Sequence, residues 1–282
     1  MPPAGWAIRE ILGPDGRLAR SLHEFEFRPF QLRMAEDLMA ALQKEENAVA
    51  EAGTGTGKTF AYLVPLILSG KKSVISTGTK NLQEQIYFKD LPLLKKAADL
   101  APDAMMMKGR KNYVCLHQYH HYFSQTSLLD PVRERVKDRL NGWLKKTELA
   151  DRAEVSWLPE DDPLWDSVSA TSEECLGADC LYQDRCFLSR LRRRAVKAGM
   201  IIVNHHLFFA DMKVKAGGFG EIIPRFQVAV FDEAHVVEEI AATYLGERLS
   251  THQLRELISD VHKGIKTLAK KELGRIQKAL DM

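Results

Sequence analysis

The residues with the clearest chemistry lie in the stretch AGTGTGKT, residues 52–59. Its glycines allow successive backbone N–H groups to turn toward a phosphate, and a helix that starts at its end adds the positive end of its dipole. Lys58 is placed to reach the β- and γ-phosphates of a nucleotide, and the Thr59 hydroxyl to ligate Mg²⁺. The first glycine of the usual pattern is replaced by Ala52. A flexible loop is the alternative, but the apolar residues before it and the helix after it favour a nucleotide site formed by Gly53, Thr54, Gly55, Thr56, Gly57, Lys58 and Thr59.

A second chemical signal is the sequence FQVAVFDEAHVVEEI, in which an apolar strand ends at Asp232. A carboxylate at the end of a neighbouring strand is where a nucleotide hydrolase holds its magnesium. We expect Asp232 to take that role, and Glu233 to orient or deprotonate the water that attacks the γ-phosphate. His235 belongs to the same group of nucleotide-site candidates. The alternative is that Asp232 and Glu233 are an ordinary polar end of a strand. The phosphate loop in the same chain favours the magnesium site.

Two further stretches suit nucleotide and nucleic-acid contacts. In FRPFQLRMAEDL, Gln31 has an amide that can read the edge of adenine, with Arg28 or Phe30 packing nearby. In STGTKNLQEQ, small hydroxyls, a lysine and helix N-terminal amides suit the backbone of a nucleic acid, which needs donors without base readout. An N-capped helix explains the second stretch equally well. The candidates for DNA contact here are Thr77, Thr79, Lys80 and Gln83.

The four cysteines are unevenly distributed: Cys115 lies in KGRKNYVCLH, and the other three lie in CLGADCLYQDRCF, residues 175–187. Structural zinc sites usually use pairs of cysteines two to four residues apart. Here one wider triplet accompanies a remote fourth cysteine, a reach that suits a larger all-cysteine iron–sulfur cluster. Zinc and unligated thiols remain open alternatives. We do not count the nearby His117, His120 and His121 among the ligands.

Basic residues lie on both sides of the cysteines. The net charge is only +2, so binding to nucleic acid has to come from local patches. Tyr113, Tyr119, Tyr122 and Phe123 place aromatic faces among these charges, as stacking on unpaired bases requires. Solvated helix faces are the alternative for such charge runs. The DNA candidates of this region are Arg110, Lys111, Arg193 and Arg194.

These side chains need a scaffold that brings them together. Short apolar segments alternate with helical stretches, which predicts a parallel sheet with helices on both faces. A long excursion rich in charge, Trp and Cys interrupts this pattern between the third and fourth strands. No run of eighteen apolar residues or secretory signal is present, which predicts a cytoplasmic protein without a membrane span. The expected strands are 48–50, 73–76, 104–107, 200–203 and 228–231.

Taken in order, Gln31 with Arg28, the loop ending at Thr59, STGTKNLQEQ, GRKNYVC and Asp232-Glu233-Ala234-His235 resemble the DinG/XPD-like iron–sulfur DNA helicases of superfamily 2. The resemblance implies an α/β fold: a P-loop RecA-like parallel sheet with an inserted iron–sulfur domain and the start of a helical Arch-like domain. The implied segments are an N-terminal segment 1–20, a first motor domain 21–107 plus 195–240, the insert 108–194 and the Arch-like start 241–282.

The resemblance also implies cofactors and partners. ATP and Mg²⁺ bind the motor, and a [4Fe–4S] cluster is held by Cys115, Cys175, Cys180 and Cys186. The implied activity is 5′ to 3′ movement on single-stranded DNA and separation of forked or duplex DNA, by a monomer.

One departure limits what we expect of this chain. The family's second motor domain, with the arginines that complete its ATP site, has no counterpart in the 282 residues. We therefore expect the chain to bind ATP–Mg²⁺ but to hydrolyse ATP poorly and not to unwind DNA by itself. Two other classes remain open: a zinc-containing P-loop ATPase that remodels RNA or protein, and a non-catalytic nucleic-acid-binding fragment.

Overall fold

The structure, a computed structural model, describes residues 4–23, 26–53, 55–124, 131–218 and 220–246, with 251, 255, 258–262 and 265. It divides into two compact units, residues 1–240 and 241–282. Most of the second unit, where the Arch-like start is expected, lies outside the described residues, as does Thr54 of the phosphate loop. The functional candidates all fall in the first unit.

The first unit is built on a four-stranded parallel sheet in the order β2-β3-β1-β4. Ile75 lies opposite Ile202 on one side and Val230 on the other. Because the strands are parallel, their carboxyl ends meet at the same edge of the sheet. The predicted α/β class with a parallel sheet is confirmed. The strands are β1 (Ser73–Thr77), β2 (Ala104–Met106), β3 (Met200–Asn204) and β4 (Val228–Phe231).

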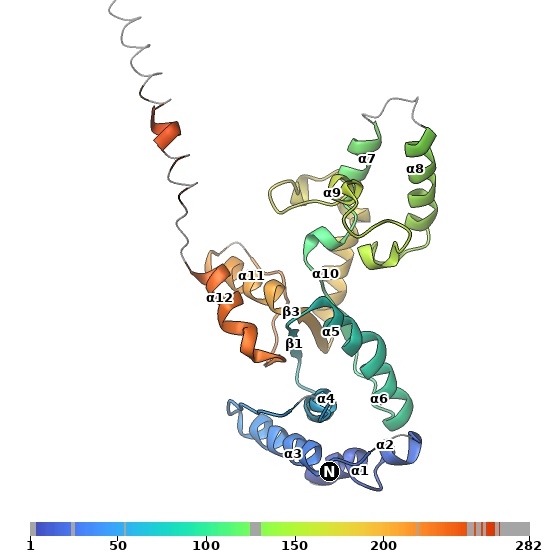
Figure 1. Cartoon of the computed structure of the whole chain (residues 1–282), viewed down its shortest axis with the longest axis vertical. Helices are drawn as coiled ribbons and strands as arrows, with labels where there is room; N and C mark the ends of the chain where they lie inside the picture. Colours follow the sequence, from blue (N-terminus) through green and yellow to red (C-terminus); the bar gives the residue numbers. More distant parts are fainter. Residues whose placement is uncertain are drawn as a thin grey trace, which may run out of the picture. The chain divides into compact units, whose positions relative to one another are not determined.

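Helices cover the sheet and bury its apolar side chains. The main core joins Ile75 and Ile202 of the sheet to the buried faces of α1, α3, α4 and α6, and Figure 1 shows α3 beside α4. Further along the chain, α11 is capped by Asn204, whose side chain accepts a hydrogen bond from Leu207 N at 2.9 Å. These helices are α1 (Ala4–Leu12), α2 (Arg17–Ser21), α3 (Pro29–Lys44), α4 (Lys58–Ser69), α5 (Lys80–Gln85), the π-helix η1 (Ile86–Asp90), α6 (Leu91–Ala98), α11 (His205–Ala216) and α12 (Val237–Leu245), preceded by the turn η6 (Ala234–Val236).

The excursion between β2 and β3 has a core of its own. Leu140, Trp165 and Phe187 are buried there with Tyr119 and other apolar residues. Figure 1 shows α7, α8 and α9 grouped together, with α10 leading from them to β3. The elements are η2 (Arg110–Asn112), α7 (Leu116–Ser124), α8 (Pro131–Leu144), η3 (Arg152–Glu154), α9 (Pro163–Val168), η4 (Gly177–Asp179), η5 (Gln183–Arg185) and α10 (Phe187–Lys197).

One expected strand is absent. Residues 48–50 are exposed, Val49 completely so, and they pair with none of the strands in the described part of the chain. A segment of three apolar residues becomes a strand only when a neighbouring strand pairs with its backbone groups, and residues 48–50 have no such partner among β1 to β4. None of the described helices is both long and apolar enough to cross a membrane.

Candidate nucleotide site and nucleic-acid surface

The phosphate loop leads directly into α4, which begins at Lys58. Gly55 and Gly57 have φ angles of +74° and +83°, in the left-handed region that favours glycine. The Thr56 hydroxyl donates to Gly53 O at 2.8 Å and so closes the loop on itself. The loop therefore lies at the N-terminus of a twelve-residue helix, where binding of an anion is favoured.

Arg28 and Gln31 hold this loop from the side of α3. The Gln31 amide nitrogen donates to Gly57 O at 2.9 Å, and the Arg28 guanidinium donates to Gly55 O. A Cβ atom on Gly57 would lie 2.1 Å from Gln31 Nε2. The Gln31 side chain is thus committed to the loop in this structure, while its contact with adenine stays a prediction.

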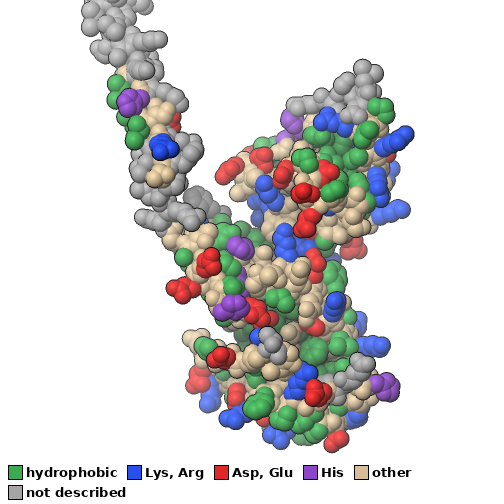
Figure 2. Space-filling view, viewed as in Figure 1, with side chains coloured by type: hydrophobic (Ala, Val, Ile, Leu, Met, Phe, Trp, Pro, Cys, Tyr) green, Lys and Arg blue, Asp and Glu red, His purple; other side chains and the backbone are tan. Residues whose placement is uncertain are grey.

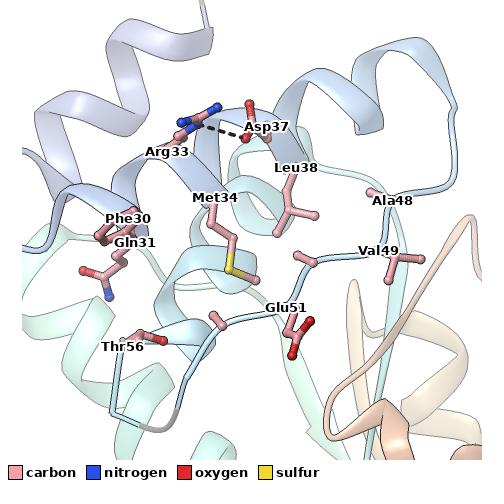
Figure 3. A pocket seen from close by; sticks show the side chains of 12 residues that line it. Phe30, Gln31, Arg33, Met34, Asp37, Leu38, Ala48, Val49, Glu51 and Thr56 are labelled. Carbon is pink, nitrogen blue, oxygen red and sulfur yellow. Dashed lines mark ion pairs between the residues drawn. The ribbon is translucent and has the colours of Figure 1, made fainter.

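A cavity of about 280 Å³ lies next to this contact. Figure 3 shows Met34 and Leu38 of α3 facing the extended segment that carries Val49 and Glu51, with Phe30 and Thr56 near the loop. Phe30 is 79% exposed, so its ring is available for stacking. The cavity therefore lies between Thr56 of the phosphate loop and the apolar side chains of Met34 and Leu38.

Asp232 and Glu233 follow β4 and face the start of α4. Lys58 Nζ is 3.5 Å from Glu233 Oε1, and Tyr62 donates from its hydroxyl to Asp232 Oδ2 at 3.0 Å. Burial, and secondarily the Asp232 charge, raises the pKa of Tyr62, so its phenol stays protonated and remains a donor. The His235 ring lies 3.4 Å from Glu233. The two predicted halves of the nucleotide site are therefore in contact.

The backbone of Glu233 is unusual, with φ 57° and ψ 46°. A residue other than glycine rarely adopts this left-handed conformation, and it costs about 1–2 kcal/mol. Just before this turn, Glu233 N donates to Asp232 Oδ1 at 3.0 Å. Strain of this kind is concentrated at functional sites in proteins.

Sequence reasoning missed Tyr62. It lies one helical turn beyond Lys58 and Thr59, so all three share a face of α4, and this spacing was the available signal. Thr59 also hydrogen-bonds the Tyr62 hydroxyl, which partly opposes the rise in the Tyr62 pKa. Thr59, Tyr62 and Asp232 together therefore supply three oxygens at the place where Mg²⁺ is expected.

The stretch after β1 is divided between surface and interior. Thr79 and Lys80 are exposed, and Thr79 caps α5 by accepting from Leu82 N at 3.3 Å. Thr77 and Gln83 are fully buried. The Gln83 amide donates to Met107 O at 2.6 Å and Ile202 O at 2.9 Å, and the Thr77 hydroxyl donates to Thr79 O at 3.0 Å. This corrects the expectation of direct DNA contacts for Thr77 and Gln83, whose polar groups are directed to the protein interior.

The four cysteines are free and half-buried. Burial raises the pKa of Cys115, and the charges of Cys175 and Cys186 raise it further. In the part of the chain that the structure describes, no group of three His, Cys, Asp or Glu side chains is arranged to hold a metal ion. The expected four-cysteine site is therefore not preformed here.

The basic candidates around the cysteines lie mostly at the surface. Lys111, Arg193 and Arg194 are exposed, and Arg110 is partly so. Lys111 and Arg194 form loose ion pairs with Asp166 at 3.5 Å and Glu148 at 3.6 Å. Figure 2 shows further Lys and Arg side chains along α8, which sequence reasoning missed. These are Arg133, Arg135, Lys137 and Arg139.

A parallel sheet with a phosphate loop facing an Asp-Glu strand end is the arrangement of the RecA-like P-loop fold. The chain matches the sequence profile of the DEAD/DEAH box helicase family over residues 28–135. Its relatives carry more specific names. It is 42% identical over 90% of its length to the ATP-dependent DNA helicase YoaA of Haemophilus influenzae, and 41% over 97% to the YoaA of Escherichia coli.

A more distant relative is the ATP-dependent helicase DinG of Mycobacterium tuberculosis, 32% identical over 79% of this chain. The chain covers 40%, 43% and 36% of the lengths of these three proteins, in the order named. The suspected resemblance to DinG-like helicases is thereby confirmed, and it concerns less than half of each relative.

Proposed function

We propose that this chain is the ATP-binding motor portion of a DNA helicase that moves 5′ to 3′ on single-stranded DNA. One observation carries the ATP-binding part of the proposal: Lys58 of the phosphate loop meets Glu233 at 3.5 Å, beside an Asp232 carboxylate that Tyr62 orients. A lysine that faces two carboxylates in this way forms, with them, the two sides of a site for a nucleoside triphosphate and its metal ion.

In this proposal each residue has one task. Lys58 and the loop N–H groups bind the β- and γ-phosphates, while Thr59 and Asp232 hold Mg²⁺. Bound Mg²⁺ supplies positive charge that neutralises the phosphate oxygens. Glu233 orients the attacking water and accepts its proton. The Lys58–Glu233 ion pair of the present structure separates when the γ-phosphate takes its place beside Lys58.

Nucleotide binding tests this proposal directly. We expect Lys58→Met to weaken the binding of a fluorescent ATP analogue about tenfold or more, because hydrogen bonds to charged groups contribute about 1.5–3 kcal/mol. Asp232→Asn should remove the part of the affinity that depends on Mg²⁺. The control is Lys44→Met, an exposed lysine at the end of α3. Unchanged affinity in Lys58→Met would contradict the assignment of the site.

We propose DNA as the partner, in single-stranded, forked or duplex form, bound by a cytoplasmic monomer. The names of the relatives and the exposed Thr79, Lys80, Lys111, Arg193 and Arg194 support this proposal. Competition between DNA and RNA oligonucleotides of the same sequence tests it. A preference for RNA, or no binding to either, would favour the RNA- or protein-remodelling class instead.

Helicase activity as a whole belongs to a longer protein in this proposal. The named relatives are more than twice as long as the matched region. An arginine supplied across the cleft is worth roughly 10³–10⁵ in rate in related nucleotide hydrolases. We therefore expect the 282 residues to hydrolyse ATP slowly and not to unwind DNA. Rapid DNA-stimulated turnover by these residues would contradict this expectation.

We also propose that Cys115, Cys175, Cys180 and Cys186 hold a [4Fe–4S] cluster. The donor chemistry fits: the four thiols are free, half-buried and of the type that binds iron–sulfur clusters, and the charges of Cys175 and Cys186 raise the pKa of Cys115. Such a cluster, when bound, cross-links the chain segments that supply its thiolates. The cysteines would hold it from the start of α7, from the turns η4 and η5 and from the start of α10.

Metal content decides between the candidate groups. Anaerobically purified protein should absorb near 400 nm and contain iron and sulfide, and Cys186→Ser should lose both. Colourless protein with stoichiometric zinc would show that the cysteines hold zinc and not an iron–sulfur cluster. Protein free of iron and zinc would leave the cysteines as thiols and contradict both assignments.

A further inference from the structure

A buried histidine connects the end of β1 to the end of β4. His205, the first residue of α11, has no exposed surface. Its Nδ1 lies 2.6 Å from Ser76 Oγ and its Nε2 lies 2.9 Å from the backbone carbonyl oxygen of Asp232. Both ring nitrogens of this side chain are therefore used, each toward a different strand end.

The partners determine the state of the ring. A carbonyl oxygen only accepts, so Nε2 carries the proton and donates to Asp232 O. Nδ1 is then the acceptor, and the Ser76 hydroxyl donates to it. A neutral imidazole has one N–H donor and one acceptor nitrogen, which matches these two partners. The link is thus directional: it runs from the Ser76 hydroxyl through the imidazole to the Asp232 carbonyl.

Each end of the link leads to a different proposed ligand. Ser76 precedes Thr77, whose hydroxyl holds Thr79 O at 3.0 Å, and Thr79 begins the exposed stretch assigned to DNA. Asp232 precedes Glu233, whose carboxylate lies 3.5 Å from Lys58 of the phosphate loop. A backbone bond from Asp232 N to Ser76 O, at 2.8 Å, joins the same two strand ends directly.

We propose that His205 is a positioning residue that couples DNA binding at the Thr79 stretch to ATP binding at the Asp232 end of β4. This inference rests on the proposed function of the two sites. His205 has no exposed atom with which to contact either ligand, so it acts only through Ser76 and Asp232. In a close-packed interior a displacement of one partner is passed to the other, because the ring has no free space in which to absorb it.

The test measures ATP affinity with and without a saturating single-stranded DNA oligonucleotide. In the wild-type chain we expect the two dissociation constants to differ by about fivefold or more, within the usual range of coupling between sites. Ser76→Ala cuts one end of the link. His205→Asn keeps an acceptor near Ser76 and is too short to reach Asp232 O, so it cuts the other end. In both variants the ratio should fall below about twofold, while each ligand alone binds within about threefold of wild type.

The control is Asn204→Ala, which removes the cap of α11 at the adjacent position and leaves the link intact. It should lower stability and keep the wild-type ratio, so a general loss of packing is separated from a loss of coupling. Circular dichroism confirms that each variant is folded.

The outcomes separate the two levels of the proposal. Failure of the wild type to bind ATP or DNA would overturn the proposed function and this inference with it. Binding of both ligands with the same ratio in wild type, Ser76→Ala and His205→Asn would overturn the role of His205 alone. Loss of the ratio in Asn204→Ala to the same extent would also overturn it.

Discussion

At the scale of single residues, the missing side chain of Gly57 makes room for the Gln31 amide. Gln31 Nε2 would lie 2.1 Å from a Cβ atom there, and it donates instead to Gly57 O at 2.9 Å. The positive φ of Gly57 adds a second reason for glycine. Gln31 thus acts on the shape of the phosphate loop.

Gly57→Ala should therefore damage both folding and binding. The left-handed conformation alone costs about 1–2 kcal/mol of unfolding free energy for alanine, and Gln31 must also move. We expect ATP affinity to fall about tenfold, equivalent to ~1.4 kcal/mol. Urea unfolding and ATP titration measure the two effects.

Gly70→Ala is the matched control for this substitution. Gly70 has φ +64° at the end of the same helix, with open space where a Cβ would lie. Gly70→Ala should lower the free energy of unfolding because of the left-handed backbone, and its ATP affinity should equal that of the wild type. Equal ATP affinity in Gly57→Ala and Gly70→Ala would contradict the role assigned to Gln31.

The sequence predicted the chemistry of the loop but not this contact. The spacing of glycines, Lys58 and Thr59 is local information, and it is sufficient to predict a phosphate site. The partner of Gln31 lies 26 residues away in the chain, so only the packing of α3 against α4 reveals it. The same holds for Tyr62 and Asp232, which are 170 residues apart.

At the scale of elements, Lys108 fastens the inserted segment to α5. Its Nζ lies 2.7 Å from Glu84 of α5 and 2.9 Å from Asp151, which caps η3 in the insert. The Lys108 side chain is 4% exposed. Tyr113 adds a further bond, since its hydroxyl accepts from Lys108 N at 2.9 Å.

We expect Lys108→Met to lower the free energy of unfolding by about 3 kcal/mol, because it leaves the Asp151 carboxylate buried without its cation. Lys111→Met removes an exposed ion pair in the same stretch, and exposed pairs contribute at most about 1 kcal/mol. Chemical unfolding of the two variants tests the comparison. Similar losses in both would show that burial does not distinguish them.

The same cluster predicts a pH dependence. Burial by itself lowers the pKa of Lys108, but the hydrogen bond to Glu84 and the charge of Asp151 outweigh it, so the pKa is raised above 10.5. The stability contributed by Lys108 is therefore complete below the unfolded-state value and is lost as the pH rises through the folded-state pKa. In unfolding measured above pH 10.5, Lys108→Met should lose less stability with pH than the wild type.

Element patterns in the sequence predicted the sheet well and the polar stretches less well. Alternation of short apolar segments with helices was sufficient for β1 to β4. Gln83 was expected at the surface because polar residues usually are exposed, and the same rule would place Lys108 there. Their burial depends on partners such as Met107, Ile202 and Glu84 that only the folded chain brings to them. The prediction of a strand at residues 48–50 was wrong for a related reason, because a strand forms only beside a neighbouring strand.

At the scale of the whole molecule, a net charge of +2 conceals local concentration of charge. Exposed Lys and Arg side chains lie on α8 and α10 of the insert. Binding of nucleic acid through such patches is sensitive to salt, because each phosphate contact releases counterions.

The double substitution Arg193→Ala/Arg194→Ala should flatten the salt dependence of single-stranded DNA binding. Each lost contact reduces the slope of log affinity against log salt by ~0.7, so we expect a reduction of ~1.4. The control is Lys95→Ala/Lys96→Ala, which removes two exposed neighbouring charges from α6. Filter binding across a salt series measures the slope. An identical slope in both double variants would exclude α10 from the DNA surface.

The backbone of Glu233 affects the molecule as a whole, because its strain is subtracted from the stability of the entire fold. Asparagine adopts the left-handed conformation more readily, so Glu233→Asn should raise the free energy of unfolding by about 1 kcal/mol. Glu45→Asn should do the same at the end of α3, where φ is 58°. Only the first substitution removes the proposed catalytic carboxylate. A laboratory selection for thermal tolerance would therefore favour the loss of Glu233 and, in the proposed mechanism, would enrich variants that are more durable and inactive.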